Sequence, residues 1–203
     1  MSIGRIALIL FGLVHCGMVQ AQQGNAASIR GAGATFPAAI YASWGQSFAK
    51  EKSIPVTYQA VGSGEGVKRI VAREVDFGAS DAAVSREEIK RHNLFQFPTV
   101  IGGIVPVVGF RPGNSGQLRL TGSVLADIFA GRITEWIDTR IAELNPGTDL
   151  PKVAITRIVR EDSSGTTEAF TIYLSVVSEN WSRSIGSGNT VSWPGTVTKA
   201  RGN

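Results

Sequence analysis

The stretch VAITRIVREDSSGTTEAFTIYLSVV, residues 153–177, contains the pattern that decides the fold class. It begins with a short apolar segment rich in β-branched residues, 153–159, which predicts a buried strand. A polar turn containing Ser163, Ser164 and Gly165 comes next, and a mainly apolar segment, 166–177, then predicts a helix. A strand, a turn and a helix in succession are typical of α/β folds.

The same alternation of short apolar segments with helical periodicity continues along the chain from Ser28, so the fold class is expected to be α/β. The apolar run 97–110 contains glycines and prolines, which predicts a buried segment that changes direction and crosses between two domains. Residues 195–203 give no strand or helix signal. The predicted helices are 37–50, 66–74, 85–91, 122–130, 140–144 and 166–177, and the predicted strands are 56–60, 77–79, 100–110 and 153–159.

Three segments share one design, a turn rich in Gly, Ser or Thr that opens a predicted helix: 31–37, 62–66 and 163–167. The free N–H groups and partial positive charge of a helix N-terminus can hold an anion. Ordinary helix capping is the better explanation of each turn on its own, and only their convergence favours an anion site. Position 36 lacks the third glycine of a dinucleotide fingerprint, and no GxxxxGK[ST] motif occurs. The spacing therefore favours a bare oxyanion over a nucleotide.

Two charged residues lie beside these turns. Arg160 follows the predicted strand 153–159, so its guanidinium could grip an oxyanion bidentately above the next turn. A surface salt bridge with Glu161 or Asp162 is the alternative. Asp81 lies at the carboxyl end of the predicted strand 77–79, where α/β proteins bind ligands. An Asp at that place is also a common helix cap.

The residue inventory argues against an enzyme. A serine hydrolase needs a histidine base and an orienting acid, but the chain has no GxSxG motif and its His92 lies among polar residues, at a predicted solvated helix end. The chain has two histidines, and the other is in the N-terminal segment, so a site with several histidine ligands is excluded and no cofactor or metal is expected.

The 203 residues are 43% hydrophobic and 18% charged, which is globular rather than disordered composition. The net charge of +4 is spread along the chain, which disfavours nucleic acid as a partner and fits a small anion.

Residues 1–21 have the pattern of a secretory signal peptide. Arg5 precedes an apolar stretch, 6–14, and Val19-Gln20-Ala21 precedes a cleavage site at Gln22. A transmembrane anchor is the alternative, but the stretch falls short of the roughly 20 residues that span a bilayer. Cys16 follows a histidine, which is a poor residue before a lipid-modified cysteine. We therefore predict a periplasmic protein, secreted without a lipid anchor, whose mature form has no cysteine and no disulfide.

Five longer motifs occur in order along the chain: GAGATFPA (31–38), YQAVGSG (58–64), VDFGASD (75–81), FQFPT (95–99) and REDSSGT (160–166). Together they resemble the periplasmic phosphate-binding proteins of high-affinity phosphate ABC transporters, and the likeness extends from about Ser28 to Pro194. The resemblance implies an α/β, periplasmic-binding-protein-like two-domain fold of type II, in which two domains joined by a hinge close on one dehydrated phosphate. It also implies two partners, inorganic phosphate and the membrane permease subunits of an ABC importer, and a monomeric protein.

The resemblance implies a role for each residue of the phosphate site. A desolvated multivalent anion costs tens of kcal/mol in a Born estimate unless donors meet every oxygen, and three helix N-termini with one arginine are a reasonable supply. The implied roles are hydroxyl and backbone donors for Thr35 and Ser63, a backbone N–H donor for Phe36, the acceptor for Asp81, the cationic partner for Arg160, donors from the second domain for Ser164, Gly165 and Thr166, and the carboxylate that orients the arginine for Asp162.

Two features depart from the family pattern. Glu65 stands where a small neutral residue is usual, and a carboxylate beside the ligand would weaken anion binding unless it points to solvent. Family members also continue well beyond Trp193-Pro194, so the C-terminal part is expected to be missing. The expected division is a signal peptide (1–21), the N-terminal part of domain 1 (22–100) and an incomplete domain 2 (101–203). Two other functions remain open: binding of another oxyanion such as sulfate, or a truncated secreted paralogue that acts in adhesion or sensing.

Overall fold

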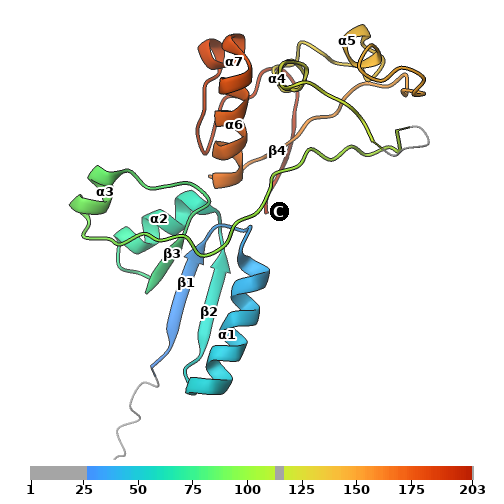
Figure 1. The fold of residues 1–203 in the computed structure, drawn as a ribbon. Coiled ribbons are helices and arrows are strands. Elements are labelled where there is room, and N and C mark those ends of the chain that lie inside the picture. The colour runs from blue at the N-terminus through green and yellow to red at the C-terminus, as the bar shows by residue number, and fades with distance from the viewer. Residues whose placement is uncertain (1–26, 113–116, 203) are drawn as a thin grey trace, which may run out of the picture.

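The computed structural model describes residues 27–112 and 117–202, which form two lobes (Figure 1). The expected signal peptide lies outside the described residues. A connection without helix or strand, residues 95–112, runs from one lobe to the other. The first lobe contains β1 (Ile29–Gly33), α1 (Ala38–Lys52), β2 (Val56–Ala60), α2 (Ser63–Val71), β3 (Phe77–Ala79) and α3 (Arg86–Arg91). The second contains α4 (Gly122–Phe129), α5 (Thr139–Ala142), β4 (Ile158–Arg160), α6 (Gly165–Val177), α7 (Glu179–Ser184) and β5 (Thr198–Ala200).

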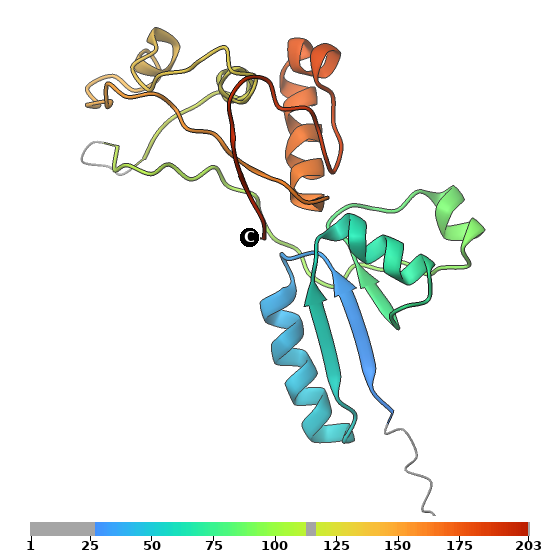
Figure 2. The same ribbon diagram turned by 180° about the vertical axis from the view of Figure 1, so that it is seen from behind.

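The first lobe is built on a parallel three-stranded sheet with the order β2-β1-β3. β1 pairs with both neighbours, with Gly33 opposite Ala60 on one side and Ala79 on the other. Because parallel crossovers are right-handed and the two here run in opposite directions, α1 and α2 cover opposite faces of the sheet. The carboxyl ends of all three strands lie at one edge, and that edge faces the second lobe (Figures 1 and 2). Ligands of open α/β sheets bind at such edges, where the strand order reverses.

Aromatic rings fix α1 on the sheet. Tyr41 of α1 meets the Tyr58 ring edge-on, with 5.1 Å between centroids, and the Tyr58 ring stacks on that of Phe77 at 5.9 Å. On the other side, α2 approaches β1 so closely that a Cβ on Gly66 would lie 2.4 Å from the Cα of Gly33. Only glycine permits this contact, which brings the start of α2 directly over the end of β1.

The second lobe packs around α4, which is buried on two sides. Val124 and Ile128 join one apolar cluster with Ile133, and Leu125 joins another with Trp181. The Trp181 side chain is fully buried, and its indole N–H donates to the carbonyl of Gly186 at 2.7 Å. β4 pairs in parallel with β5. None of the helices within residues 27–112 and 117–202 has the length and apolar character needed to cross a membrane.

Several sequence predictions are wrong in detail. The run 100–110, which is predicted to be a buried strand, forms no strand, and Ile101 and Val107 are 96% and 87% exposed. The reason is that no strand of the described chain lies beside it to pair with it. The strand expected at 153–159 is shorter and displaced, at Ile158–Arg160. β5 lies in the stretch 195–203, where no element was expected, and β1 and α7 were not predicted.

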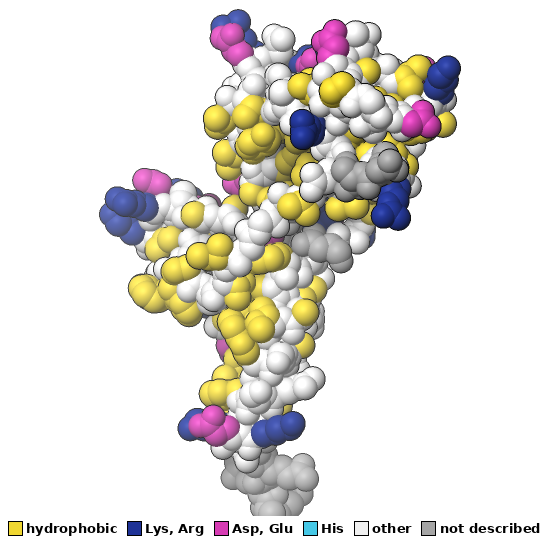
Figure 3. All heavy atoms as spheres, turned by 45° about the vertical axis from the view of Figure 1, so that its right-hand side comes forward, with side chains coloured by type: hydrophobic (Ala, Val, Ile, Leu, Met, Phe, Trp, Pro, Cys, Tyr) yellow, Lys and Arg dark blue, Asp and Glu magenta, His cyan; other side chains and the backbone are white. Residues whose placement is uncertain are grey.

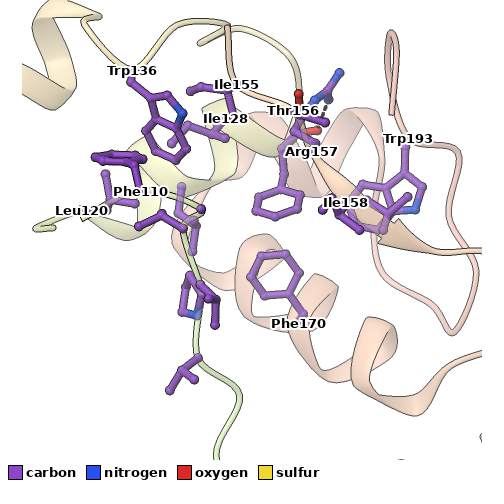
Figure 4. A pocket seen from close by; sticks show the side chains of 18 of the residues that line it. Phe110, Leu120, Ile128, Trp136, Ile155, Thr156, Arg157, Ile158, Phe170 and Trp193 are labelled. Carbon is purple, nitrogen blue, oxygen red and sulfur yellow. Dashed lines mark hydrogen bonds between the residues drawn. The ribbon is translucent and has the colours of Figure 1, made fainter. Parts of the chain in front are cut away.

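Apolar side chains remain open to solvent in both lobes (Figure 3). In the second lobe they line a cavity of about 610 Å³ between the connection and β4 (Figure 4). Phe110, Trp136, Phe170 and Trp193 form much of its wall. The apolar faces of α4 and α6 are therefore incompletely covered by the described residues.

Candidate anion-binding site

The residues expected to hold an anion come together between the two lobes. The first lobe contributes the turns that follow β1, β2 and β3, and the second contributes the end of β4 and the N-terminus of α6. Figures 1 and 2 both show the first turn of α6 directed at the carboxyl edge of the sheet. Residues that are far apart in sequence thus converge because every one of them follows a parallel strand or opens a helix at this edge.

Arg160 is held by Asp162 and reaches the first lobe. Its Nε donates to Asp162 Oδ1 at 2.7 Å and its Nη2 donates to Asp162 Oδ2, while Nη1 donates to Thr35 Oγ1 at 3.2 Å. The side chains of Arg160 and Asp162 are only 12% and 15% exposed. The bidentate pair orients the guanidinium fork, and hydrogen bonding from Arg160 lowers the pKa of Asp162. The salt bridge considered as the alternative is therefore present with Asp162, but it is buried rather than at the surface, and it directs Arg160 across the lobe boundary.

Asp81 faces the second lobe. Thr166 Oγ1 donates to Asp81 Oδ2 at 3.1 Å, and the Asp81 backbone N–H donates to Ser63 Oγ at 3.2 Å. Burial raises the pKa of the Asp81 carboxyl, against the opposing effects of Thr166 and Arg160. The capping alternative for Asp81 is wrong, because α3 is capped by Ser85, whose side chain accepts from the Glu88 N–H. Asp81 is thus a solvent-accessible acceptor beside a donor helix.

The N-terminus of α6 presents the second lobe's donors. Ser164 is buried and caps the helix, since its Oγ accepts from the Thr167 N–H at 3.2 Å. Gly165 lies so close to the first lobe that a Cβ there would be 2.5 Å from Ser63 Oγ. A hydroxyl that accepts one hydrogen bond can still donate its proton, so capping by Ser164 is compatible with donation to a ligand.

Two residues that support the site, Tyr58 in the first lobe and Asn189 in the second, were given no role by the sequence. The Tyr58 hydroxyl donates to the Ala34 carbonyl at 2.6 Å and so fixes the backbone immediately before Thr35. Burial raises the pKa of that hydroxyl, which keeps it protonated as a donor. Phe36 follows in the same turn, and its ring lies against Gly102 of the connection. On the second lobe, the Asn189 carbonyl accepts from the Ser164 N–H at 3.0 Å. Asn189 lies in a Gly- and Ser-rich stretch with no distinguishing signal.

Glu65 does not place a free carboxylate in the site. Its Oε1 accepts from Arg69 Nε at 2.9 Å, one turn along α2, and Arg69 also donates to Gln59. The neighbouring cation balances the charge and draws the carboxylate along the helix. The weakening of anion binding considered for this residue is therefore not expected.

The groups that converge at this site are of the kinds that recognise an anion. His92 ends α3 as its C-cap, and no contact joins it to Arg160 or Asp81 among the interactions of the described chain. Within residues 27–112 and 117–202, no cluster of three His, Cys, Asp or Glu side chains could hold a metal ion. What converges is one guanidinium, hydroxyls, a helix N-terminus and one carboxylate acceptor. This set suits an oxyanion that still carries a proton.

Comparison with known proteins shows which family the chain resembles. The chain is 49% identical to the phosphate-binding protein PstS of Pasteurella multocida over 170 residues, which are 84% of this chain and 49% of that protein. It is 36% identical to the protein of the same name from Methanocaldococcus jannaschii over 174 residues, covering 82% of this chain and 45% of that one. The chain therefore spans about half the length of the curated relatives it matches.

Solved structures share the fold. A Clostridium perfringens structure, described as a phosphate ABC transporter substrate-binding protein with bound phosphate, matches with a TM-score of 0.65 at 21% identity, over 86% of this chain and 62% of that one. An ABC-type phosphate transport receptor from Vibrio cholerae matches with a TM-score of 0.59 at 19% identity, over 87% of this chain and 64% of that one. These matches confirm the expected α/β periplasmic-binding-protein fold. A sequence profile of the PBP superfamily domain matches residues 19–199, and the chain therefore belongs to the PBP superfamily.

Proposed function

We propose that this chain binds inorganic phosphate between its two lobes, outside the cytoplasm, for delivery to the permease subunits of an ABC importer. The ligand-binding residues are those expected from the sequence: Thr35, Phe36, Ser63, Asp81, Arg160, Ser164, Gly165 and Thr166. The division into a first domain (22–100) and a second (101–203) is part of the same proposal. The site performs no catalytic step in this role.

The observation that carries the proposal is that Arg160 reaches Thr35 and Thr166 reaches Asp81 across the two lobes. The guanidinium and the α6 N-terminus supply positive potential and donors for phosphate oxygens. Asp81 supplies an acceptor, and phosphate near neutral pH has a P–OH group to donate to it. Sulfate has no such proton, so a carboxylate would meet only like charge, a mismatch that can cost several kcal/mol. The site chemistry therefore favours phosphate over the alternative oxyanion.

The relatives support the transport role. Those matched at 36% to 49% identity are named phosphate-binding proteins, but each is about twice as long as the part this chain covers. Periplasmic location, the permease partner and the monomeric state are accordingly proposals for this chain. No observation on the described residues favours an adhesion or sensing role.

Calorimetric titration of the purified chain with phosphate, arsenate and sulfate at fixed ionic strength tests the proposal. We expect one phosphate per chain, competition by arsenate, and no competition by sulfate. Circular dichroism on the same sample establishes that the chain is folded. A folded sample that shows no saturable phosphate binding, or that binds sulfate equally well, would overturn the proposal.

A further inference from the structure

Gly64 and Ser163 meet across the boundary between the lobes. Gly64 is the second residue of α2, and its N–H donates to the Ser163 carbonyl at 3.2 Å, in the turn between β4 and α6. A Cβ added to Gly64 would lie 2.0 Å from Ser163 Oγ and 2.7 Å from Ser163 Cβ. The next nearest atom, Nδ2 of Asn189, is 3.6 Å away, which is ordinary van der Waals contact. The Ser163 side chain thus occupies the space that a side chain on residue 64 would need.

Side-chain rotation cannot relieve this contact. Turning χ1 of Ser163 would move its Oγ, but the position of its Cβ is fixed by the backbone. A side chain on residue 64 would therefore push the turn 161–164 away from α2. That turn holds Asp162 and lies between Arg160 and α6, so the bonds from Arg160 to Thr35 and from Thr166 to Asp81 would lengthen together.

The glycine at position 64 has no other evident use. Its backbone is helical, and glycine is the poorest helix former after proline, so alanine would ordinarily favour α2. The neighbouring contacts are equally close: a Cβ on Gly62 would lie 2.7 Å from Asp162 Oδ2. The absence of a side chain at residue 64 allows the two lobes to approach each other closely.

We propose that Gly64 and Ser163 are a complementary positioning pair that sets the separation of the two lobes and, through it, the affinity of the site for phosphate. Neither residue belongs to the expected ligand set. The pair acts by bringing Arg160 and the α6 N-terminus within reach of Thr35 and Asp81. The affinity effect rests on the proposed function, whereas the steric complementarity does not.

The test is a double-mutant cycle with Gly64→Ala, Ser163→Gly and the combined variant, and Gly109→Ala as the control. A Cβ on Gly109 has no atom within 4 Å, so the control makes the same substitution in open space. Because contacting residues couple strongly, we expect Gly64→Ala to weaken phosphate binding by about tenfold or more, and the combined variant to recover to within about threefold of the parent. Ser163→Gly alone and the control should stay within about threefold of the parent.

Hydrogen exchange of the residue 64 amide, followed by NMR, gives a second measurement that needs no ligand. This amide should be protected in the parent, exchange faster in Gly64→Ala, and regain protection in the combined variant. A parent that binds no phosphate would refute the proposed function. The amide exchange rates of the parent and the variants would still decide whether Gly64 and Ser163 form a positioning pair. The positioning pair is overturned if Gly64→Ala retains parental exchange, or if the combined variant is as impaired as Gly64→Ala.

Discussion

Arg160→Ala removes the cation that joins the two lobes. The substitution deletes two hydrogen bonds to Asp162 and one to Thr35. It also leaves the Asp162 carboxylate, which is only 15% exposed, without the guanidinium that lowers its pKa. Both phosphate affinity and the pH dependence of stability should therefore change.

The burial of the pair sets the magnitude. Because the two side chains are 12% and 15% exposed, solvent screens their interaction weakly. Bound phosphate would meet the guanidinium in the same weakly screened surroundings, and truncating one partner of a buried, hydrogen-bonded charge pair between protein and ligand costs about 2–5 kcal/mol. This is a loss of about thirtyfold to several thousandfold in phosphate affinity, measured by calorimetry. Arg160→Lys should recover only part of it, since an ammonium lacks the planar fork.

The effect on stability has a definite sign. In the parent, Asp162 has a lowered pKa in the folded state, so it contributes stability above its ordinary pKa and this is lost as the pH falls through the folded value. In Arg160→Ala that acid-sensitive contribution should disappear, and the difference in melting temperature between parent and variant should shrink as the pH falls. Arg183→Ala is the charge-matched control, because its side chain is 77% exposed and pairs only locally with Glu179. If Arg160→Ala binds phosphate as tightly as this control, Arg160 is a structural ion pair and no ligand residue.

Three further predictions concern single residues. Asp81→Asn should narrow the preference for phosphate over sulfate, because an amide can donate as well as accept; competition titration measures this, and unchanged discrimination would remove Asp81 from the site. Burial raises the Asp81 pKa, so its charge opposes folding, and Asp81→Asn should be more stable than the parent above that pKa. This difference in melting temperature should shrink as the pH falls through the Asp81 pKa, while the phosphate affinity of the parent falls; a difference that does not change with pH would contradict this assignment. Trp181→Ala should cost about 3–5 kcal/mol, because the ring is fully buried; a cooperative thermal transition at the parental temperature would show that the second lobe does not depend on it.

The sequence predicts elements well where local pattern and tertiary environment agree. The strands at Val56–Ala60 and Phe77–Ala79 have the expected bounds. β1, with the sequence IRGAG, has little apolar pattern, because the Phe77 ring lies against Gly31 and the backbones of β3 and α2 approach Gly33. Its glycines therefore predict a turn rather than a strand. The strand prediction for the exposed run 100–110 is wrong for the opposite reason. An apolar pattern favours burial, but a strand also needs a neighbouring strand with which to pair.

The candidate site residues follow from local sequence patterns and stay a prediction, whereas their geometry does not follow from such patterns. Gly-rich turns before helices, Arg160 after a strand and Asp81 at a strand end are local patterns. The bond from Arg160 to Thr35 and the contact between Gly64 and Ser163 depend on how two lobes meet, which no short stretch of sequence encodes. Tyr58 illustrates the same limit: the parallel register pairs it with Gly31, and from there its hydroxyl reaches the Ala34 carbonyl in the turn after β1.

The long sequence separation of the cross-lobe hydrogen bonds has a consequence for folding order. The bond from Arg160 to Thr35 joins residues 125 positions apart, and that from Thr166 to Asp81 joins residues 85 apart. The sheet β2-β1-β3, by contrast, is complete once residues 29–79 are available. Loop-closure entropy penalises the long connections most, so the first lobe should acquire structure while the second is still being synthesised. Phosphate binding would then report the last step of folding, and weakened variants should lose ligand before they lose helical circular dichroism.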